Sequence, residues 1–197
     1  MKEEKLIPIP VEISARHVHL TQKHFETLFG KKEPTFYRKL GQSQFACQEK
    51  VCLKNKDKEI KNVRLVAPFR EKSQVEISIT DAFKLGIKPV IRVSGDLKGT
   101  PSITLIGPRG KVKLKEGVIV AQRHLHLNEK EAKKLSLKNG EIISVLIKGK
   151  RAVIFGGVVV RVNEKFNCCL HLDTDEGNAC GITKKGRGFL PRTIRKS

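Results

Sequence analysis

A histidine tripeptide occurs twice in this chain and constrains its fold more than any other feature. One copy is His17-Val18-His19 in Ser-Ala-Arg-His-Val-His-Leu, and the other is His124-Leu125-His126 in Ala-Gln-Arg-His-Leu-His-Leu. In an extended strand, residues i and i+2 face the same side, so each tripeptide can present two imidazoles to one metal ion. Duplication of a strand could also have copied the histidines passively. The repeat predicts two related halves, each with a strand that carries two candidate metal ligands.

Each half carries one further candidate ligand on a later strand. The candidate in the first half is Glu76 in Gln-Val-Glu-Ile-Ser, and the candidate in the second half is His171 in Cys-Leu-His-Leu-Asp. Both precede a Thr-Asp pair, but the spacing to that pair differs by one residue, so the copies are not in perfect register. Glu76 could instead face solvent, and His171 could be a hydrogen-bonded core histidine. Three protein ligands leave one position of a tetrahedral zinc open for substrate, as in catalytic sites.

The apolar runs are short, β-branched and bounded by Gly, Pro, Asn or Asp, which is typical of strands. They are 11–14, 51–53, 63–66, 75–79, 91–93, 142–147, 158–162 and 169–172. The pattern predicts a mainly β fold of the barrel kind. Short helices are expected after the two tripeptides, over 23–29 and 129–135, because Thr21 and Asn128 can cap them.

The charge balance is strongly basic, with 40 Lys and Arg residues against 20 Asp and Glu, a formal net charge of +20. Such a field attracts nucleic acid, an anionic membrane or a phosphorylated cofactor. Lysines scattered singly over a solvated surface would give the same balance. RNA bases would find few aromatic side chains to stack on, since the chain has no Trp and one Tyr. The balance supports an anionic ligand without naming RNA.

Several classes of protein are disfavoured by what the sequence lacks. No apolar run is long enough to span a bilayer, and the first ten residues lack the apolar core of a signal peptide. The five cysteines are an odd number without Cys-x-x-Cys spacing, which indicates free thiols in a cytoplasm. No Gly-x-Ser-x-Gly elbow or P-loop occurs, so metal is expected to carry the chemistry.

The histidine tripeptides belong to an ordered series of motifs over nearly the whole chain. The series comprises 14–20, 41–51, 63–70, 74–78, 92–96, 123–127 and 171–179. In this order the motifs resemble those of the PduL-type phosphate acyltransferases, also called phosphate propanoyltransferases. That family moves an acyl group between coenzyme A and inorganic phosphate. The resemblance implies an acyltransferase that interconverts acyl-CoA plus phosphate with acyl phosphate plus coenzyme A.

The resemblance also implies an architecture and a cofactor. It implies two β-barrel domains capped by short helices, with the active site at their junction. These domains would cover 16–121 and 122–197, the second completed by the N-terminal strand 5–15. Two zinc ions per chain would be held by two sets of three residues, His17, His19 and Glu76 in one and His124, His126 and His171 in the other.

Further residues are assigned to the substrates by the same resemblance. Arg70 would grip phosphate as the catalytic residue, because a guanidinium presents a rigid fork of donors to an oxyanion. Ser14, Arg64 and Asn178 would contact coenzyme A, and Gln74 and Ser94 would line the phosphate pocket. Each of these five could instead be a turn-former or surface residue.

Two chemical routes and two rival functions stay open from the sequence. Phosphate could attack the thioester directly, or a covalent acyl-cysteine could form on Cys169, which shares a strand face with His171. The rivals are a dinuclear zinc thioesterase or other hydrolase and a basic, zinc-stabilised β-barrel protein that binds RNA. We predict an acyltransferase in which phosphate attacks the thioester directly.

The expected partners are a coenzyme A thioester and phosphate, without nucleic acid or membrane, in a homodimer. Only sixteen residues precede His17, whereas some relatives carry a long N-terminal extension that directs them into bacterial microcompartments. We therefore expect a soluble cytoplasmic enzyme, for which acetyl-CoA is as plausible a substrate as propanoyl-CoA.

Overall fold

The structure is a computed structural model that describes residues 6–41 and 44–191. It divides into two compact units, one formed by residues 15–122 and the other by the described parts of residues 1–14 and 123–197. Both units consist mainly of strands, with two short helices in each. The mainly β fold with short helices, predicted from the sequence, is confirmed.

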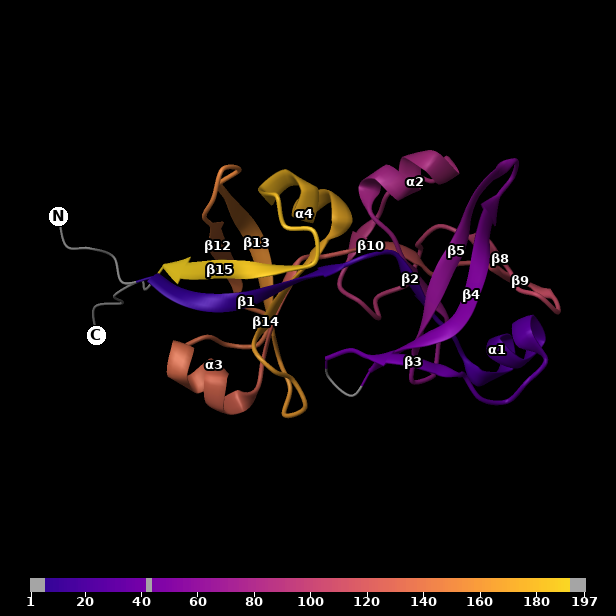
Figure 1. Ribbon diagram of the computed structural model, residues 1–197, viewed down its shortest axis with the longest axis horizontal. Helices are drawn as coiled ribbons and strands as arrows, with labels where there is room; N and C mark the ends of the chain where they lie inside the picture. Colours follow the sequence, from indigo (N-terminus) through magenta and orange to yellow (C-terminus); the bar gives the residue numbers. More distant parts are fainter. Residues whose placement is uncertain (1–5, 42–43, 192–197) are drawn as a thin grey trace. The chain divides into compact units, whose positions relative to one another are not determined.

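The unit that contains the C-terminal half is a closed barrel of six strands in the order β1-β14-β11-β13-β12-β15. Its strands are β1 (Leu6–Ser14), β11 (His124–Leu127), β12 (Ile142–Ile147), β13 (Val153–Val162), β14 (Cys169–Asp173) and β15 (Lys185–Pro191). The barrel closes because β15 pairs with both β12 and β1. In Figure 1, indigo β1 and yellow β15 lie side by side, although they come from opposite ends of the described chain.

The other unit is a nine-stranded sheet in the order β7-β10-β6-β2-β5-β4-β8-β9, with β3 paired to β4. The sheet curls into a half-barrel, where the resemblance implied the first barrel. Its strands are β2 (His17–His19), β3 (Phe36–Lys39), β4 (Phe45–Asn55), β5 (Lys58–Ala67), β6 (Gln74–Glu76), β7 (Ile91–Arg92), β8 (Ile103–Ile106), β9 (Lys111–Leu114) and β10 (Val118–Ala121).

Five neighbouring strands of each unit have the same pairing pattern, so the sequence repeat is also a repeat of topology. The run β4-β5-β2-β6-β10 corresponds to the run β12-β13-β11-β14-β1. Along each run the pairs are antiparallel, parallel, antiparallel and parallel. Each strand that carries a histidine tripeptide therefore lies in the middle of its run, with a paired strand on either side.

Two helices follow the tripeptides, as predicted. They are α1 (Gln22–Phe29) and α3 (Glu129–Leu135), and the side chains of Thr21 and Asn128 accept hydrogen bonds from backbone N–H groups in their first turns. Phe25 and Leu28 of α1 are fully buried, so this helix packs on the core of its unit.

Two more helices, α2 (Ile79–Leu85) and α4 (Thr174–Cys180), were not predicted. The prediction of one strand over 75–79 was wrong at its end, because β6 ends at Glu76 and the Ser78 side chain accepts the Asp81 N–H at the start of α2. Asp173 and Glu176 form a reciprocal capping box that starts α4. The spacings Ser-x-x-Asp and Asp-x-x-Glu were the available signals for these two helices.

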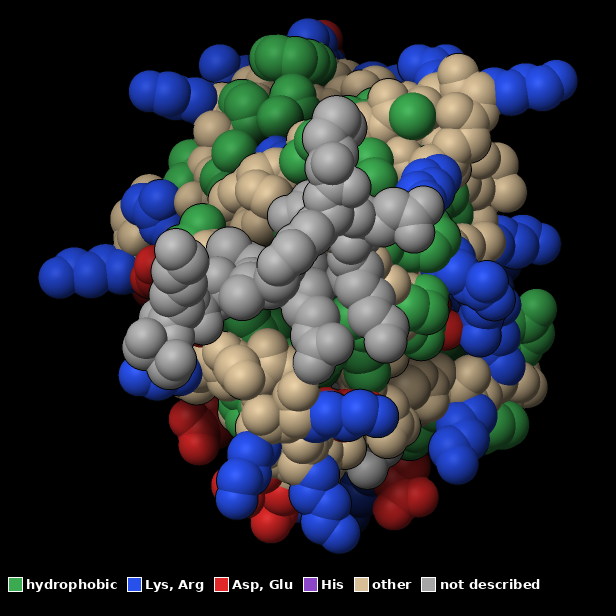
Figure 2. All heavy atoms as spheres, turned by 90° about the vertical axis from the view of Figure 1, so that its left-hand side faces the viewer, with side chains coloured by type: hydrophobic (Ala, Val, Ile, Leu, Met, Phe, Trp, Pro, Cys, Tyr) green, Lys and Arg blue, Asp and Glu red, His purple; other side chains and the backbone are tan. Residues whose placement is uncertain are grey.

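Figure 2 shows one face of the molecule. Lys and Arg side chains project around much of it, and acidic side chains are visible between them, most of them toward the lower edge. Basic charge is thus spread around this face instead of forming one patch, which agrees with singly scattered lysines. Among the described residues, no helix has the length and apolar character needed to cross a membrane.

Gly177 offers a test of how tightly α4 packs on its barrel. A Cβ at this position would stand 2.6 Å from the Ile182 carbonyl oxygen and 2.8 Å from Ile13 Cδ1. We expect Gly177→Ala to lower the free energy of unfolding by about 1–3 kcal/mol, measured by urea denaturation, because a backbone oxygen must shift. The control is Gly156→Ala on β13, where the nearest atom would be Ser144 Oγ at 3.7 Å. Equal losses in the two variants would contradict this packing.

Candidate active site

The first histidine tripeptide lies on β2, between β5 and β6. In the antiparallel pairing of β2 with β6, His17 is opposite Glu76 and His19 is opposite Gln74. Residues opposite each other in a ladder project to the same face, and His19 shares that face because it is two residues from His17. The ligand atoms of His17, His19 and Glu76 lie within 4.8 Å of one another. Strand register thus brings the first predicted triad together.

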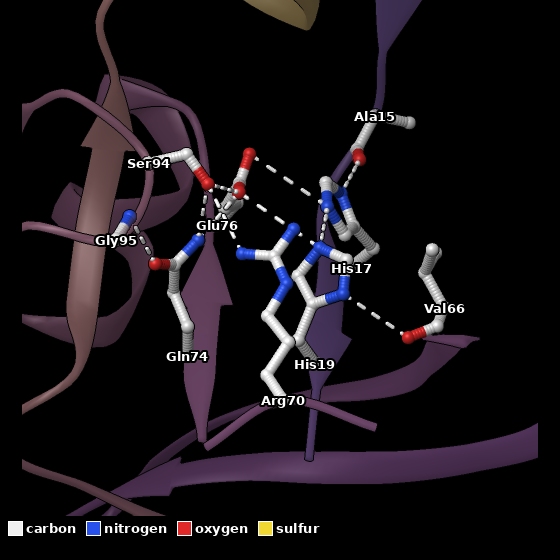
Figure 3. Close-up of polar contacts among 9 residues, drawn as sticks. All are labelled: Ala15, His17, His19, Val66, Arg70, Gln74, Glu76, Ser94 and Gly95. Atoms are coloured by element: carbon white, nitrogen blue, oxygen red, sulfur yellow. Dashed lines mark hydrogen bonds and ion pairs between the residues drawn. The ribbon is translucent and has the colours of Figure 1, made fainter. Parts of the chain in front are cut away.

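Backbone carbonyl groups orient both rings of this cluster (Figure 3). His17 Nδ1 lies 2.9 Å from the Ala15 oxygen, and His19 Nδ1 lies 3.1 Å from the Val66 oxygen. A carbonyl oxygen only accepts, so each Nδ1 donates, and in a neutral ring Nε2 then carries the lone pair. The two Nε2 atoms are 3.1 Å apart, and carboxylate oxygens of Glu76 lie 3.7 Å and 3.9 Å from them. Three electron-pair donors therefore face one point, an arrangement that can hold a divalent cation.

The protonation states also suit a cation. Burial lowers the pKa of His19 well below its usual value, and the neighbouring His17 and Arg70 lower it further. Burial alone would raise the pKa of Glu76, but His17, His19, the Ser94 hydroxyl and Arg70 outweigh burial, and the net pKa is lowered. The cluster therefore combines a neutral His19 with an ionised Glu76 at neutral pH.

A hydrogen-bond network connects this cluster to Arg70. The Ser94 hydroxyl donates to Glu76 Oε1 over 2.8 Å, and it accepts from Arg70 Nη1 over 3.1 Å and from Gln74 Nε2 over 2.9 Å. One donated and two accepted bonds use the full capacity of a hydroxyl. Gln74 Oε1 in turn accepts the Gly95 N–H over 2.8 Å. The four predicted residues Arg70, Gln74, Glu76 and Ser94 thus form one connected set (Figure 3).

The loop that carries Arg70 is bonded to the start of α1. The Arg70 N–H donates to the Leu20 carbonyl over 2.9 Å, and Ser73 Oγ accepts the Thr21 N–H over 3.0 Å. His24 Nδ1 lies 2.7 Å from the same Ser73 oxygen. No functional role was predicted for Ser73 or His24, which are 49 residues apart, and no local pattern indicates that they meet.

The second tripeptide has the same register in the barrel unit. In the antiparallel pairing of β11 with β14, His124 is opposite His171 and His126 is opposite Cys169. The ring centroids are 4.5 Å apart for His124 and His126, 5.2 Å for His124 and His171, and 4.7 Å for His126 and His171. The structure therefore gathers the second predicted triad, although within the described residues the first triad alone has all its ligand atoms within 4.8 Å of one another.

Burial is the largest influence on the pKa of His126 in the second cluster. It lowers the pKa of His126, and the neighbouring His124 and His171 lower it further. Phe166 packs against His126 with a centroid distance of 4.0 Å. His126 is therefore a neutral imidazole in an apolar surrounding, a state in which its nitrogen can bind a metal.

The predicted coenzyme A contacts are distributed over both units. Arg64 on β5 donates to the Cys47 carbonyl, and its guanidinium lies 4.3 Å from the centre of the Tyr37 ring. Ser14 ends β1 and is paired with Asp173, the N-cap of α4, while Asn178 is exposed on α4. Ser14 and Asn178 thus belong to the barrel unit and Arg64 to the half-barrel unit.

The cysteine of the alternative route is buried. Cys169 is 8% exposed, and its thiol donates to the Leu170 carbonyl over 3.7 Å. Burial raises the pKa of Cys169 to about 12 and that of Cys168 to about 11. Both side chains are thiols at neutral pH, and neither forms a disulfide.

Comparison with known proteins identifies the family. The family model described as phosphate propanoyltransferase matches residues 10–183, which include every predicted site residue. The chain belongs to the phosphate propanoyltransferase family. This confirms the resemblance read from the motifs and the prediction of an acyltransferase.

Curated relatives that carry the name phosphate propanoyltransferase match most of the chain. A protein of Lachnoclostridium phytofermentans is 46% identical over 177 residues, which are 89% of this chain and 83% of the relative. One of Thermotoga maritima is 46% identical over 174 residues, 87% of this chain and 83% of the relative. One of Listeria monocytogenes is 44% identical over 184 residues, 92% of this chain and 86% of the relative. Each match is long enough to include both histidine clusters.

Proposed function

We propose that this protein transfers an acyl group between coenzyme A and inorganic phosphate, with propanoyl-CoA or acetyl-CoA as the thioester. The observation that carries the proposal is the position of Arg70, which Ser94 fixes beside the cluster of His17, His19 and Glu76. An oxyanion site next to a cluster of metal-ligating side chains suits a reaction between a phosphate and a thioester. The names of the relatives support the same reaction.

The cofactor we propose is zinc, with two ions per chain. His17, His19 and Glu76 would hold one ion, and His124, His126 and His171 would hold the other. The residues of the first cluster fit zinc because two imidazole lone pairs and a carboxylate face one point. When bound, zinc supplies a Lewis acid that stabilises a developing oxyanion or a departing thiolate.

The residues of the chain would bind and orient the two substrates. Arg70 would bind two phosphate oxygens with its planar guanidinium, whose orientation is fixed by the bond to Ser94. A phosphate oxygen would then attack the thioester carbonyl carbon, and the carbon–sulfur bond would break to give acyl phosphate and the coenzyme A thiolate. Positioning both reactants in this way lowers the barrier by up to about 7–11 kcal/mol in favourable cases.

Contacts to coenzyme A are proposed for Ser14, Arg64 and Asn178. Arg64 stacks on the half-exposed Tyr37 ring, so a cation and an aromatic face are presented together at the surface. This pairing suits the phosphates and the adenine of a nucleotide. Gln74 would line the phosphate site together with Ser94, because the Gln74 amide donates a hydrogen bond to the Ser94 hydroxyl beside Arg70.

Direct transfer is preferred over an acyl-cysteine. The thiol of Cys169 is buried and donates to a backbone carbonyl of its own strand, so it is not presented as a nucleophile.

The reaction is tested by incubating the protein with acetyl-CoA or propanoyl-CoA and measuring free thiol with and without phosphate. We expect release that depends on phosphate and yields acyl phosphate. Release without phosphate would favour the hydrolase, and no release combined with salt-sensitive binding of an oligonucleotide would favour the RNA-binding protein.

Arg70→Ala is expected to lower kcat/KM for phosphate by about 100- to 1000-fold, since an oxyanion donor is lost. Arg187→Ala, an exposed substitution on β15, is the matched charge control.

The metal sites are tested by measuring the zinc content of the purified protein. We expect two ions per chain, one ion after either His17→Ala or His124→Ala, and none in the double variant, because each cluster loses a ligand. Removal of zinc with a chelator should abolish acyl transfer, and added zinc should restore it. Full zinc content in both single variants would rule out the proposed ligands.

The covalent route is tested by Cys168→Ala combined with Cys169→Ala. We expect turnover within about tenfold of the parent, since no acyl-enzyme forms on either thiol. Loss of turnover in a variant that keeps its zinc and its melting temperature would show that direct transfer is wrong.

A further inference from the structure

An ion pair of the same kind occurs beside each histidine cluster. In the half-barrel unit, Arg16 Nη1 lies 3.0 Å and 3.2 Å from the two carboxylate oxygens of Asp81. In the barrel unit, Arg123 Nε lies 2.7 Å from Glu176 Oε1. Each arginine immediately precedes the first histidine of its tripeptide. Each carboxylate belongs to the helix that follows the strand with the third ligand.

The two ion pairs occupy equivalent positions. Asp81 follows Glu76 by five residues, and Glu176 follows His171 by five residues. Both carboxylates are the third residue after the N-cap of their helix, since the caps are Ser78 in α2 and Asp173 in α4. The lengths of the side chains compensate, because the shorter Asp81 meets the outer end of its arginine and the longer Glu176 meets the inner nitrogen.

Each ion pair joins the two segments that supply the three ligands of one cluster. Arg16 and His17 are adjacent on one segment, and Glu76 and Asp81 are five residues apart on the other. Antiparallel pairing of His17 with Glu76 connects the same two segments at the ligands themselves. The two segments are thus joined at two points, by the strand pairing of His17 with Glu76 and by the ion pair of Arg16 with Asp81.

The burial of the acidic partners makes these contacts specific. The Asp81 side chain is 3% exposed and that of Glu176 is 16% exposed, whereas the two arginines are 38% and 31% exposed. A carboxylate of this burial is stable only when it is paired or fully hydrogen-bonded. The Asp81 and Glu176 N–H groups also bond the caps of their helices, so each carboxylate is anchored to a rigid turn.

In the half-barrel unit the ion pair is connected to the His17 ring through the backbone. Arg16 is the residue between Ala15 and His17, and the Ala15 carbonyl accepts the His17 Nδ1–H over 2.9 Å. Fixing the Arg16 side chain holds the backbone of this carbonyl in place. The carbonyl in turn keeps the proton of His17 on Nδ1, which leaves the Nε2 lone pair directed toward His19 and Glu76.

We propose that Arg16 and Arg123 are positioning residues, each of which holds the first histidine of one cluster in its metal-binding orientation through an ion pair with Asp81 or Glu176. The part that concerns metal affinity rests on the proposed function. The part that concerns the orientation of the His17 ring holds for the metal-free protein as well.

The affinity test measures Zn²⁺ binding to each cluster by competition with a chromophoric chelator. One series of full-length proteins carries His124→Ala, so that the first cluster is measured, and the other carries His17→Ala, so that the second is measured. We expect Arg16→Met to weaken binding at the first cluster by about 10-fold or more and to leave the second unchanged, and Arg123→Met to do the reverse. Arg16→Lys should recover part of the affinity, since it keeps the charge.

Controls separate positioning from general destabilisation. Lys61→Met removes one partner of an exposed ion pair with Glu59 in the same unit and should change neither affinity. Asp81→Asn keeps the size of the side chain and should weaken the first cluster as Arg16→Met does, with little further loss when the two are combined. Equal weakening of both clusters by Arg16→Met, or no weakening in a folded variant, would overturn the proposal.

A second measurement needs no metal. In the metal-free protein with isotopically labelled histidine, NMR should show the His17 proton on Nδ1 in the parent and a mixture of the two tautomers in Arg16→Met. An unchanged tautomer in a variant with an intact fold would overturn the proposal for His17. If the parent shows the Nδ1 tautomer but binds no zinc, the proposed metal site fails while the positioning role of Arg16 is still decided by the variant.

Discussion

The structure depends on the antiparallel pairing of each histidine strand with the strand that carries the third proposed ligand. In one unit His17 is opposite Glu76, and in the other His124 is opposite His171. A shift of one residue in either ladder would turn the third side chain to the other face of the sheet. The core residues on the opposite face, such as Val18 and Leu125, are fully buried and would be turned outward by the same shift. Core packing and the site therefore select the same register.

Local patterns in the sequence predicted much of this arrangement. The two tripeptides and the caps Thr21 and Asn128 are readable from spacings of two or three residues, and they predicted α1 and α3. The strands were predicted from short β-branched runs, and Glu76 and His171 were candidates because each lies on a later strand among apolar neighbours. The apparent mismatch between the halves arose from aligning the Thr-Asp pairs. The equivalent carboxylates are Asp81 and Glu176, each five residues beyond the third ligand, and with this alignment the register is the same in both halves.

Contacts between distant segments could not be predicted from the same patterns. Arg16 and Asp81 are 65 residues apart, and His24 and Ser73 are 49 residues apart. The helices α2 and α4 were missed because the alternating apolar residues before them resemble strands, and only a side-chain cap decides where the strand ends. Closure of one sheet and not the other depends on β15, whose pairing with both β1 and β12 is a property of the whole barrel.

The two clusters share a register but differ in charge, and this difference gives each a separate chemical character. The first combines two imidazoles with an ionised carboxylate, whereas the second has three imidazoles, of which His126 is held neutral by burial. The same divalent cation would keep more of its positive charge in the second cluster and attract an anion more strongly there. In the first cluster the carboxylate offsets part of the charge, and Arg70 restores positive charge close by through Ser94. An anion such as phosphate would thus meet a favourable field at either cluster. At the first cluster a guanidinium is also held close by, because Arg70 and Glu76 both hydrogen-bond to the Ser94 hydroxyl.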